Sequence, residues 1–300
     1  MSYEYHKPVL LHQCVEALNI SKGKSYVDVT FGGGGHSRAI LEKIEDGKLY
    51  AFDQDEDALQ NLPKSENLVF INHNFRFLKR FLSYHNAIPV HGVFADLGIS
   101  SYQIDTGSKG FSVRFSGPLD MRMNQTMTQT AEDILMNYSP DELLRVLGEY
   151  GEVRNAKTLV AAIVDARNKG IQFNSTDAFV AFLKNVAMGN ENKYYAQVFQ
   201  ALRIEVNDEM GALKDMLMQS LEVLEKGGRL VVLTYHSLED RLVKNFMKTG
   251  NFQNELVKDA FGKISKPFKL INKKPIEADR IEVKQNSRAR SAKLRIAEKL

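Results

Sequence analysis

Short apolar runs alternate with amphipathic stretches along the first third of the chain. The runs are rich in β-branched and aromatic residues, which predicts strands, while the stretches between them repeat apolar residues at helical spacing. Strands joined by helices in this way form a parallel sheet covered on both faces. The sequence therefore predicts an α/β fold, with strands at 26–29, 48–52, 67–71 and 91–96 and helices at 37–44, 56–62 and 77–84.

The next apolar run, 228–234, follows about 130 residues later, which is too long for one connection between neighbouring strands. An inserted domain is therefore predicted at 103–195, between the core segments 1–102 and 196–300. A glycine-containing loop at 100–124 leads into it. Its helices are predicted at 139–150, 155–168 and 175–186, and two further helices, 194–207 and 210–224, lead back to the sheet.

Three more elements are predicted after the strand 228–234. A helix covers 238–247, and two β-type runs, 267–272 and 289–296, close the sheet as an antiparallel pair. The predicted architecture is thus a Rossmann-like core with an inserted helical domain.

The basic residues are concentrated at the C-terminal end. The chain has 40 Lys and Arg and 37 Asp and Glu, a net charge of +3. From Arg241 onward there are 16 basic and 6 acidic residues, or +10, which leaves 24 and 31, or −7, before it. Such a basic segment can hold a polyanion through phosphate contacts, and a solvated charged surface is the alternative.

Composition also bears on the compartment. Hydrophobic residues make up 43% of the chain, as in ordinary globular proteins. No apolar stretch approaches the roughly 20 residues of a membrane helix, and the polar start, 1–7, lacks the apolar middle of a signal peptide. The single cysteine, Cys14, cannot form an internal disulfide. We therefore expect a cytoplasmic protein with no membrane partner.

A glycine run follows the first predicted strand, in the segment VDVTFGGGGH at 27–36. A strand, a glycine turn and a helix in succession bring backbone N–H groups to a nucleotide or a carboxylate. The NAD fingerprint needs glycine at the first, third and sixth positions, and no register of this run supplies the sixth. The class I methyltransferase turn, an acid followed by alternate glycines, fits Asp28, Gly32 and Gly34, with Thr30 at the place of the first glycine.

Acids at the ends of two other strands extend this pattern. Asp53 ends the second predicted strand, at the spacing of a carboxylate that binds both ribose hydroxyls. Asp96 ends the fourth, where the methyltransferase fold brings the methyl group and its acceptor together. The segment LEKGGRLVVL at 224–233 resembles the double-glycine turn before the fifth strand of class I methyltransferases. These features favour S-adenosylmethionine over a nicotinamide cofactor.

Three motifs and the C-terminal segment resemble one family. They are DLGISSYQ at 96–103, GFSVRFSGPLDMRM at 110–123, YHSLEDR at 235–241 and NSRARSAKLR at 286–295. Together they are similar to the bacterial 16S ribosomal RNA (cytosine N4)-methyltransferase family, also called ribosomal RNA small subunit methyltransferase H, over nearly the whole chain. The resemblance implies a class I methyltransferase that uses S-adenosylmethionine. The implied substrate is a cytidine in the decoding centre, at the P site, of 16S rRNA within the small ribosomal subunit.

The resemblance also implies which residues bind the cofactor. They are Gly34, Gly35 and His36 at the methionine part, Asp53 at the ribose, Phe75 or alternatively Phe77 at the adenine, and Asp96 and Gln103 around the rest of the pocket. Without the resemblance, a helix cap for His36 and a core position for Phe75 are the alternatives. Asp96 is the catalytic candidate, because a carboxylate that accepts hydrogen bonds from the cytosine amino group restores its delocalised lone pair.

RNA contacts are expected from aromatic and basic side chains. Tyr235 is the first candidate for the ring that receives the flipped base, ahead of Tyr102, Phe111 and Phe115. The candidate phosphate contacts are Arg122, Arg203, Arg288, Arg290, Lys293 and Arg295.

Other readings of the sequence stay open. His236 and Glu239 are spaced like an acid/base pair, but local structural roles at a helix start are the alternative. No group of residues has metal-ligand spacing, and a homodimer is one of the alternatives for the oligomeric state. The rival functions are a methyltransferase for protein or small molecules and a noncatalytic RNA-binding or ribosome-assembly protein.

Overall fold

The computed structural model describes residues 8–256 and 266–300, so the segment 1–7 that bears on a signal peptide lies outside the described residues. The chain divides into two compact units. The core unit runs up to Gly98 and resumes at Met210, and the insert unit is Ile99–Glu209. The boundary predicted at 195 falls within the continuous helix α9, Glu191–Asn207, so the insert unit extends to the end of that helix.

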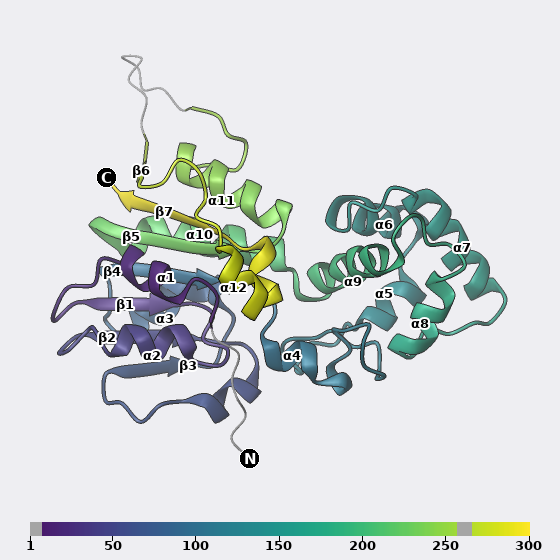
Figure 1. The fold of residues 1–300 in the computed structure, drawn as a ribbon, viewed down its shortest axis with the longest axis horizontal. Helices are drawn as coiled ribbons and strands as arrows, with labels where there is room; N and C mark the ends of the chain where they lie inside the picture. Colours follow the sequence, from purple (N-terminus) through teal and green to yellow (C-terminus); the bar gives the residue numbers. More distant parts are fainter. Residues whose placement is uncertain (1–7, 257–265) are drawn as a thin grey trace. The chain divides into compact units, whose positions relative to one another are not determined.

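A seven-stranded sheet forms the centre of the core unit, in the order β3-β2-β1-β4-β5-β7-β6 (Figure 1). The first five strands in this order are parallel, and β7 is antiparallel to both β5 and β6. The α/β fold and the antiparallel closing pair predicted from the sequence are confirmed. The strands are β1 Ser25–Asp28, β2 Lys48–Phe52, β3 Leu68–Ile71, β4 Val90–Asp96, β5 Leu224–Thr234, β6 Phe268–Leu270 and β7 Lys293–Lys299.

The strand order reverses at β1, which pairs with β2 on one side and with β4 on the other. Asp28 at the end of β1 lies opposite Ala51 of β2 and Phe94 of β4. In open α/β sheets, ligands bind outside the carboxyl ends of the strands at such a reversal. The topology therefore places a candidate site where the loops after β1, β2, β4 and β5 begin.

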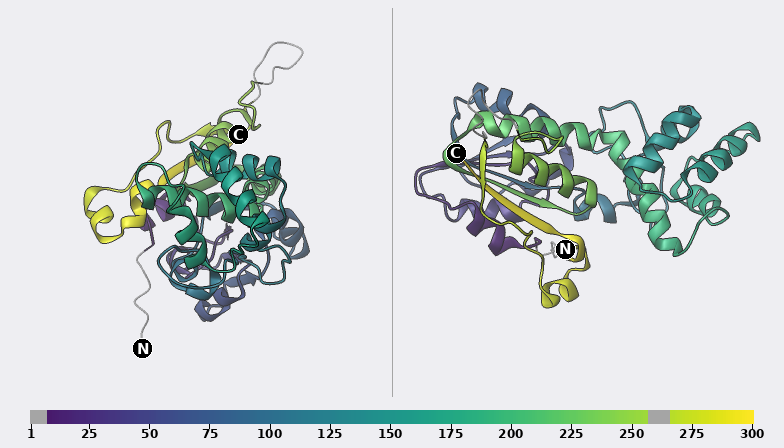
Figure 2. Two further views of the ribbon diagram at one scale, coloured as in Figure 1. Left: turned by 90° about the vertical axis from the view of Figure 1, so that its right-hand side faces the viewer. Right: turned by 90° about the horizontal axis from the view of Figure 1, so that it is seen from above.

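Helices cover both faces of this sheet. In Figure 1 α1, α2 and α12 lie in front of the strands and α3 and α10 lie behind them, and the view from above in Figure 2 agrees. On the front face Cys14 and Ile40 are buried with Tyr26, Phe94 and Val231 in one apolar cluster. The helices are α1 Leu11–Ala17, α2 Gly35–Leu41, α3 Leu78–Tyr84, α10 Glu209–Val223, α11 Ser237–Thr249 and α12 Arg280–Gln285.

Two predicted elements differ in kind from the observed ones. The segment predicted as a helix at 56–62 is a 3₁₀ helix, Glu56–Asn61, and it ends before Pro63, which disfavours helical geometry at the residue preceding it. The β-type run at 289–296 is split between a 3₁₀ turn, Ser287–Ser291, and the strand β7. The turn begins because the Asn286 side chain accepts a hydrogen bond from the Arg288 N–H.

The insert unit is helical and has a core of its own. Leu135, Leu159, Phe179 and Leu202 belong to one buried cluster in it. The predicted capping box opens α6, where the Ser139 side chain accepts from the Glu142 N–H. The helices are α4 Ser101–Asp105, α5 Ala131–Asn137, α6 Pro140–Arg145, α7 Ala156–Asn168, α8 Thr176–Leu183 and α9, with a π-helical turn at Val146–Tyr150.

The sequence prediction missed two short helices of the insert unit. The segment 100–124, predicted as a loop, contains α4, which the Ser100 and Gln103 side chains cap reciprocally. The helix α5 has the same kind of cap, made by Thr130 and Asp133. Both caps were readable in the sequence, but the helices they start are too short to show apolar periodicity.

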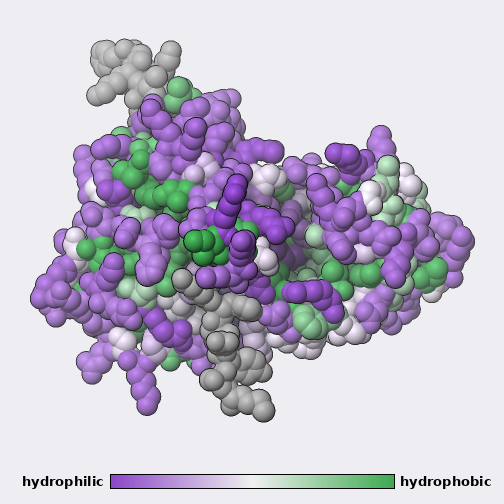
Figure 3. Space-filling model, in the orientation of Figure 1, coloured by the Kyte–Doolittle hydropathy of each residue, from purple (hydrophilic) through white to green (hydrophobic). Residues whose placement is uncertain are grey.

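The face drawn in Figure 3 is mainly hydrophilic, with small apolar patches between charged side chains. Among the residues that the structure describes, none of the helices is long and apolar enough to cross a membrane.

Candidate active site at the carboxyl edge of the sheet

The glycine turn after β1 is anchored by Asp28, which is fully buried. One carboxylate oxygen of Asp28 accepts from the Thr30 N–H at 3.0 Å, and the other accepts from the Ser37 hydroxyl at 2.6 Å. Burial raises the pKa of Asp28, and the hydrogen bond from Ser37 opposes that rise. The carboxylate thus ties the strand end to the first turn of α2 and fixes the loop between them.

Thr30 stands where the common methyltransferase turn has glycine, and the structure gives a reason for it. Its hydroxyl donates to Asp28 at 3.3 Å and accepts from the Asp96 N–H at 2.6 Å. Glycine could not make this bridge. Thr30 therefore connects the ends of β1 and β4 and positions the backbone of Asp96.

Two glycines of the run are required by close packing. Gly34 has a φ of +73°, and a Cβ there would lie 2.8 Å from the Phe31 ring. At Gly35 a Cβ would lie 2.2 Å from a side-chain carbon of Pro8. The turn is therefore packed from both sides, and the Gly34 N–H donates to the Phe31 carbonyl at 2.7 Å.

Asp53 follows β2 and points toward the same turn. One carboxylate oxygen accepts from the Gly32 N–H at 2.7 Å and the other from the Asp55 N–H at 2.9 Å. Burial raises the pKa of Asp53 to about 6, although these hydrogen bonds lower it. Each carboxylate oxygen has a second lone pair, so this oriented side chain can still accept from a pair of ribose hydroxyls.

Asp96 is the centre of the site. Its Oδ1 accepts from the Tyr235 hydroxyl at 2.7 Å, and its Oδ2 lies 3.6 Å from His36 Nδ1. Burial raises the pKa of Asp96 to about 7, the hydrogen bond from Tyr235 opposes the rise, and the negative charge of Glu239 adds to it. A carboxyl group with this pKa exchanges protons near neutral pH, as a general base must.

His36 lies at the start of α2 beneath Asp96. Its Nε2 is 3.1 Å from the Val9 carbonyl, which can only accept, so Nε2 carries the proton. Burial lowers the pKa of His36, which keeps the ring neutral at pH 7. Its Nδ1 lone pair therefore faces Asp96, and the side chain does not cap α2, whose N-cap is Gly34.

The predicted adenine-binding residues belong to the core unit, and the predicted pocket residue Gln103 belongs to the insert unit. Phe75 and Phe77 lie in a 3₁₀ turn after β3, with Phe75 half-buried and Phe77 exposed against the His73 ring. Gln103 belongs to the insert unit, where its side chain accepts from the Ser100 N–H at 3.0 Å.

Tyr235 and the two residues spaced like an acid/base pair begin α11. The Tyr235 ring is half-buried against the apolar cluster that contains Phe94 and Val231. Its hydroxyl donates to Asp96, so this end of the side chain already has a partner within the protein. His236 is the N-cap of α11, and Glu239 accepts from the backbone N–H groups of Tyr235 and His236. The local structural role left open for His236 and Glu239 is the one observed.

The four basic residues predicted in the tail differ in exposure. Arg295 is buried, and its guanidinium donates to Asp240 at 2.6 and 3.0 Å. Lys293 lies 3.9 Å from the same carboxylate. Arg288 is half-buried, and Arg290 is exposed in the 3₁₀ turn before β7. Arg290 is therefore the most accessible of the four to a phosphate.

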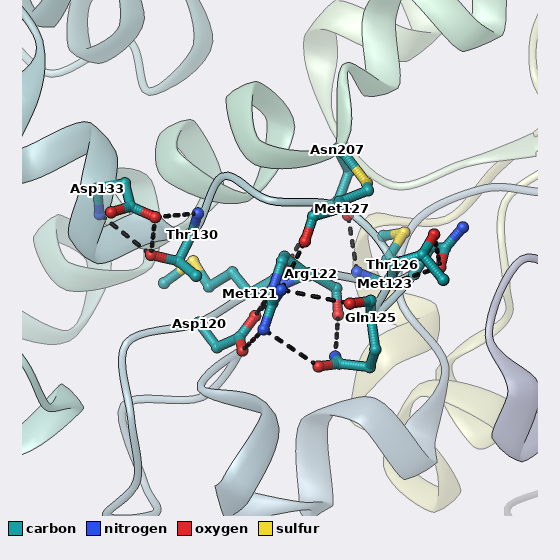
Figure 4. Close-up of polar contacts among 11 residues, drawn as sticks. Asp120, Met121, Arg122, Met123, Gln125, Thr126, Met127, Thr130, Asp133 and Asn207 are labelled. Carbon is teal, nitrogen blue, oxygen red and sulfur yellow. Dashed lines mark hydrogen bonds and ion pairs between the residues drawn. The ribbon is translucent and has the colours of Figure 1, made fainter.

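In the insert unit, Arg122 belongs to the loop that carries the PLDMRM motif (Figure 4). Its guanidinium binds the Asp120 carboxylate through two hydrogen bonds, at 2.8 and 2.7 Å, and donates to the Met127 carbonyl. Asn207 is buried at the end of α9, accepts from the Met123 N–H and donates to the Met121 carbonyl, both at 2.8 Å. Arg122 thus holds its own loop together.

Arg203 is similarly committed, because it binds Glu209 at 2.7 and 3.0 Å. Sequence reasoning singled out these arginines by charge alone and did not single out Asn207 or the linking role of Thr30. No local signal marks either partner, since Asn207 and Met123 are 84 residues apart and Thr30 and Asp96 are 66 apart.

The strand order, the glycine turn after β1 and the acids after β2 and β4 define a class I methyltransferase. The chain belongs to the MraW methylase family, whose model matches residues 3–300. The family recognised in the sequence is thus confirmed, as are methyl transfer as the reaction and S-adenosylmethionine as the cofactor of this family.

Curated relatives match over almost their full length. The chain is 54% identical over 299 residues to "Ribosomal RNA small subunit methyltransferase H" of Cytophaga hutchinsonii, covering 98% of this chain and 99% of that one. It is 51% identical over 297 residues to the protein of the same name from Bacteroides fragilis, covering 98% and 97%. Among solved structures, an rRNA methylase from Streptococcus thermophilus shares 14% identity, with a TM-score of 0.40 and coverage of 97% and 93%.

The residues at the sheet edge fit S-adenosylmethionine. The Asp53 carboxylate is oriented for hydroxyl donors, and the turn at Gly34 and Gly35 leaves no room for side chains. A positively charged sulfonium is favoured beside Asp96, because the carboxylate pays a desolvation penalty that a nearby cation offsets.

Proposed function

We propose that this protein transfers a methyl group from S-adenosylmethionine to N4 of a cytidine in the decoding centre, at the P site, of 16S rRNA. The observation that carries the chemistry is Asp96 at the carboxyl edge of the sheet, whose backbone N–H donates to the Thr30 hydroxyl and whose carboxylate accepts from the Tyr235 hydroxyl. The choice of RNA is supported by the names of the relatives, which are methyltransferases of small-subunit ribosomal RNA.

The acceptor determines what Asp96 must do. The N4 lone pair of cytosine is delocalised into the ring, so the amine is a weak nucleophile. The Oδ2 atom accepts a hydrogen bond from N4, while Oδ1 is held by the Tyr235 hydroxyl. This draws the nitrogen toward a pyramidal geometry and aims its lone pair at the methyl group. When bound, S-adenosylmethionine supplies that methyl group on a sulfonium.

The proton balance also involves Asp96. As the N4–C bond forms and the carbon–sulfur bond breaks, the amine loses one proton. A carboxyl group with a pKa of about 7 can accept this proton and release it to solvent after transfer. Neutral His36, whose Nδ1 lies 3.6 Å from Oδ2, keeps the carboxyl group free of a competing cation.

The cofactor is assigned to the residues predicted for it. Gly34, Gly35 and His36 meet the methionine part, Asp53 the ribose and Phe75 the adenine. The insert unit, predicted to recognise the substrate, takes part in holding RNA. Among the predicted phosphate contacts, Arg290 is exposed and Arg288 half-buried, whereas Arg122, Arg203 and Arg295 each bind a carboxylate of the protein.

Methyl transfer to RNA tests the proposal. Small subunits isolated from a strain that lacks the gene are incubated with the protein and labelled cofactor, and the modified nucleotide is mapped by mass spectrometry. Label on N4 of one decoding-centre cytidine is expected. Label on protein, on another base, or none at all despite measurable cofactor binding would overturn the proposed substrate.

A further inference from the structure

Two aromatic side chains of the insert unit are exposed to solvent. Tyr102, in α4, and Phe115, in the loop that follows η3 (Gly107–Lys109), each keep 39% of their surface exposed. The neighbouring Phe111 of the same loop is buried. Exposed aromatic rings offer a flat face on which a nucleic-acid base can stack.

A cation lies against each of these rings. Lys109 Nζ is 5.3 Å from the centre of the Tyr102 ring, and the Arg114 guanidinium is 5.8 Å from that of Phe115. Lys109 itself is buried, and its charge helps to lower the pKa of the Asp120 carboxyl group. Arg114 lies 3.7 Å from Asp105 and its side chain is 65% exposed, so it is the basic group that this surface offers to RNA.

The backbone that carries the rings is rigid. The segments around Gly107 and Gly117 touch so closely that a Cβ on Gly117 would lie 2.0 Å from the Gly107 carbonyl. The Thr176 hydroxyl, at the start of α8, donates to the Phe115 carbonyl at 2.8 Å and accepts from the Gly117 N–H at 3.2 Å. The rings are thus presented from a fixed backbone, so little conformational entropy is lost on binding.

We propose that Tyr102 and Phe115, with Arg114, form a stacking surface for unpaired nucleotides of the RNA substrate. Aromatic rings combined with basic groups hold single-stranded RNA by stacking on bases and by charge on phosphates. When a base flips out of its stack, the neighbouring bases lose stacking contacts. An aromatic surface of this kind can replace those contacts. The inference rests on the proposed RNA substrate and adds where its flanking nucleotides bind.

The test measures the affinity of the full-length protein for a single-stranded ribo-oligonucleotide that contains the decoding-centre sequence. Phe115→Ala and Tyr102→Ala are each expected to weaken binding about tenfold, since one stacked base contributes roughly 1–3 kcal/mol. Tyr102→Phe, which keeps the ring, should bind like the wild type. Tyr84→Ala is the matched control, because Tyr84 is 80% exposed but lies in the core unit beside the His85 ring.

A second readout does not depend on affinity. The chain has no tryptophan, so Phe115→Trp places a single indole on the proposed surface. Stacking of a base should quench its fluorescence on RNA addition, and cofactor binding should be unchanged. Unaltered fluorescence, or alanine variants within twofold of wild-type affinity, would overturn the stacking surface. In that case, methylation of the cytidine by the wild-type protein would still support the proposed function. Absence of this methylation would instead count against the proposed function alone.

Discussion

Two loops of this protein are held by a buried polar side chain, one in each unit. The glycine turn of the core unit is anchored by Asp28, a carboxylate. The loop of the insert unit that contains Met121 and Met123 is anchored by Asn207, an amide. Both anchors are almost completely buried. Buried polar side chains are normally hydrogen-bonded, and each of these two stabilises its loop through such bonds.

The two anchors differ in charge, and this difference distinguishes the loop near the catalytic groups from the loop that only supports the structure. Around Asp28 lie other titratable groups, Asp53, Asp96 and His36, and burial shifts the pKa of each of them. Asn207 has no charge to titrate and holds its loop equally at any pH near neutrality. We therefore expect changes in the core-unit loop to alter activity and pH dependence, and changes in the insert-unit loop to alter stability.

The largest effect is expected at Asp96. Asp96→Asn removes the proton acceptor while keeping the size of the side chain, and kcat should fall about 10²- to 10⁴-fold. Cofactor affinity, measured by calorimetry, should change far less. A loss in cofactor affinity equal to the loss in kcat would contradict a chemical role.

The same variant has a stability signature. The pKa of Asp96 is raised to about 7 in the folded state, so between pH 4 and 7 the folded protein binds more protons than the unfolded chain. The unfolding free energy of the wild type without cofactor therefore falls as pH rises through this range. At pH 8, Asp96→Asn should unfold at a higher denaturant concentration than the wild type.

On the insert-unit side, Asn207→Ala should lower the unfolding free energy by about 1–3 kcal/mol, because the Met123 N–H and the Met121 carbonyl lose their partner. Denaturant unfolding measures this change, and cofactor affinity should remain as in the wild type. Asn207→Asp is the sharper variant, because it keeps the acceptor but loses both donors and buries a charge. If either variant weakens cofactor binding instead, the two loops do not divide their roles as described.

The pH dependence of activity is a smaller effect. Asp96 must be ionised to accept from N4, and with a pKa of about 7 its ionised fraction rises about tenfold from pH 6 to pH 8. Initial rates at subsaturating cofactor and RNA should rise by the same factor. Asp53, with a pKa of about 6, adds a further loss on the acid side through weaker cofactor binding, which calorimetry measures separately.

The smallest effect is expected for Tyr235→Phe. Without the hydroxyl the pKa of Asp96 rises, on the order of one unit, so the rate at pH 7 should fall about fivefold and recover toward pH 9. If the Tyr235 ring only stacks on the base, the phenylalanine ring would do the same, and the pH profile of the variant's activity would be unchanged. The position of the acidic limb therefore distinguishes the two roles.

Much of the fold could be predicted where its signals are local. The glycine turn and the strand runs of the core unit and the capping box at Ser139 in the insert unit each lie within a few consecutive residues. The long interval before β5 predicted an insert, and the end predicted for it, residue 195, lies within α9. Charge in the tail was also visible, but not that Arg295 is buried against Asp240, because the pairing partner is 55 residues away.

By itself, the sequence determined the α/β class, the position of the glycine turn and the family, since these depend on apolar period, backbone freedom and contiguous motifs. Only the tertiary structure decided that Thr30 bridges β1 to Asp96, that Tyr235 binds the same carboxylate and that Asn207 anchors a distant loop. Those links join residues far apart in the chain, and their strength depends on burial, which exists only once the sheet and the helices have packed.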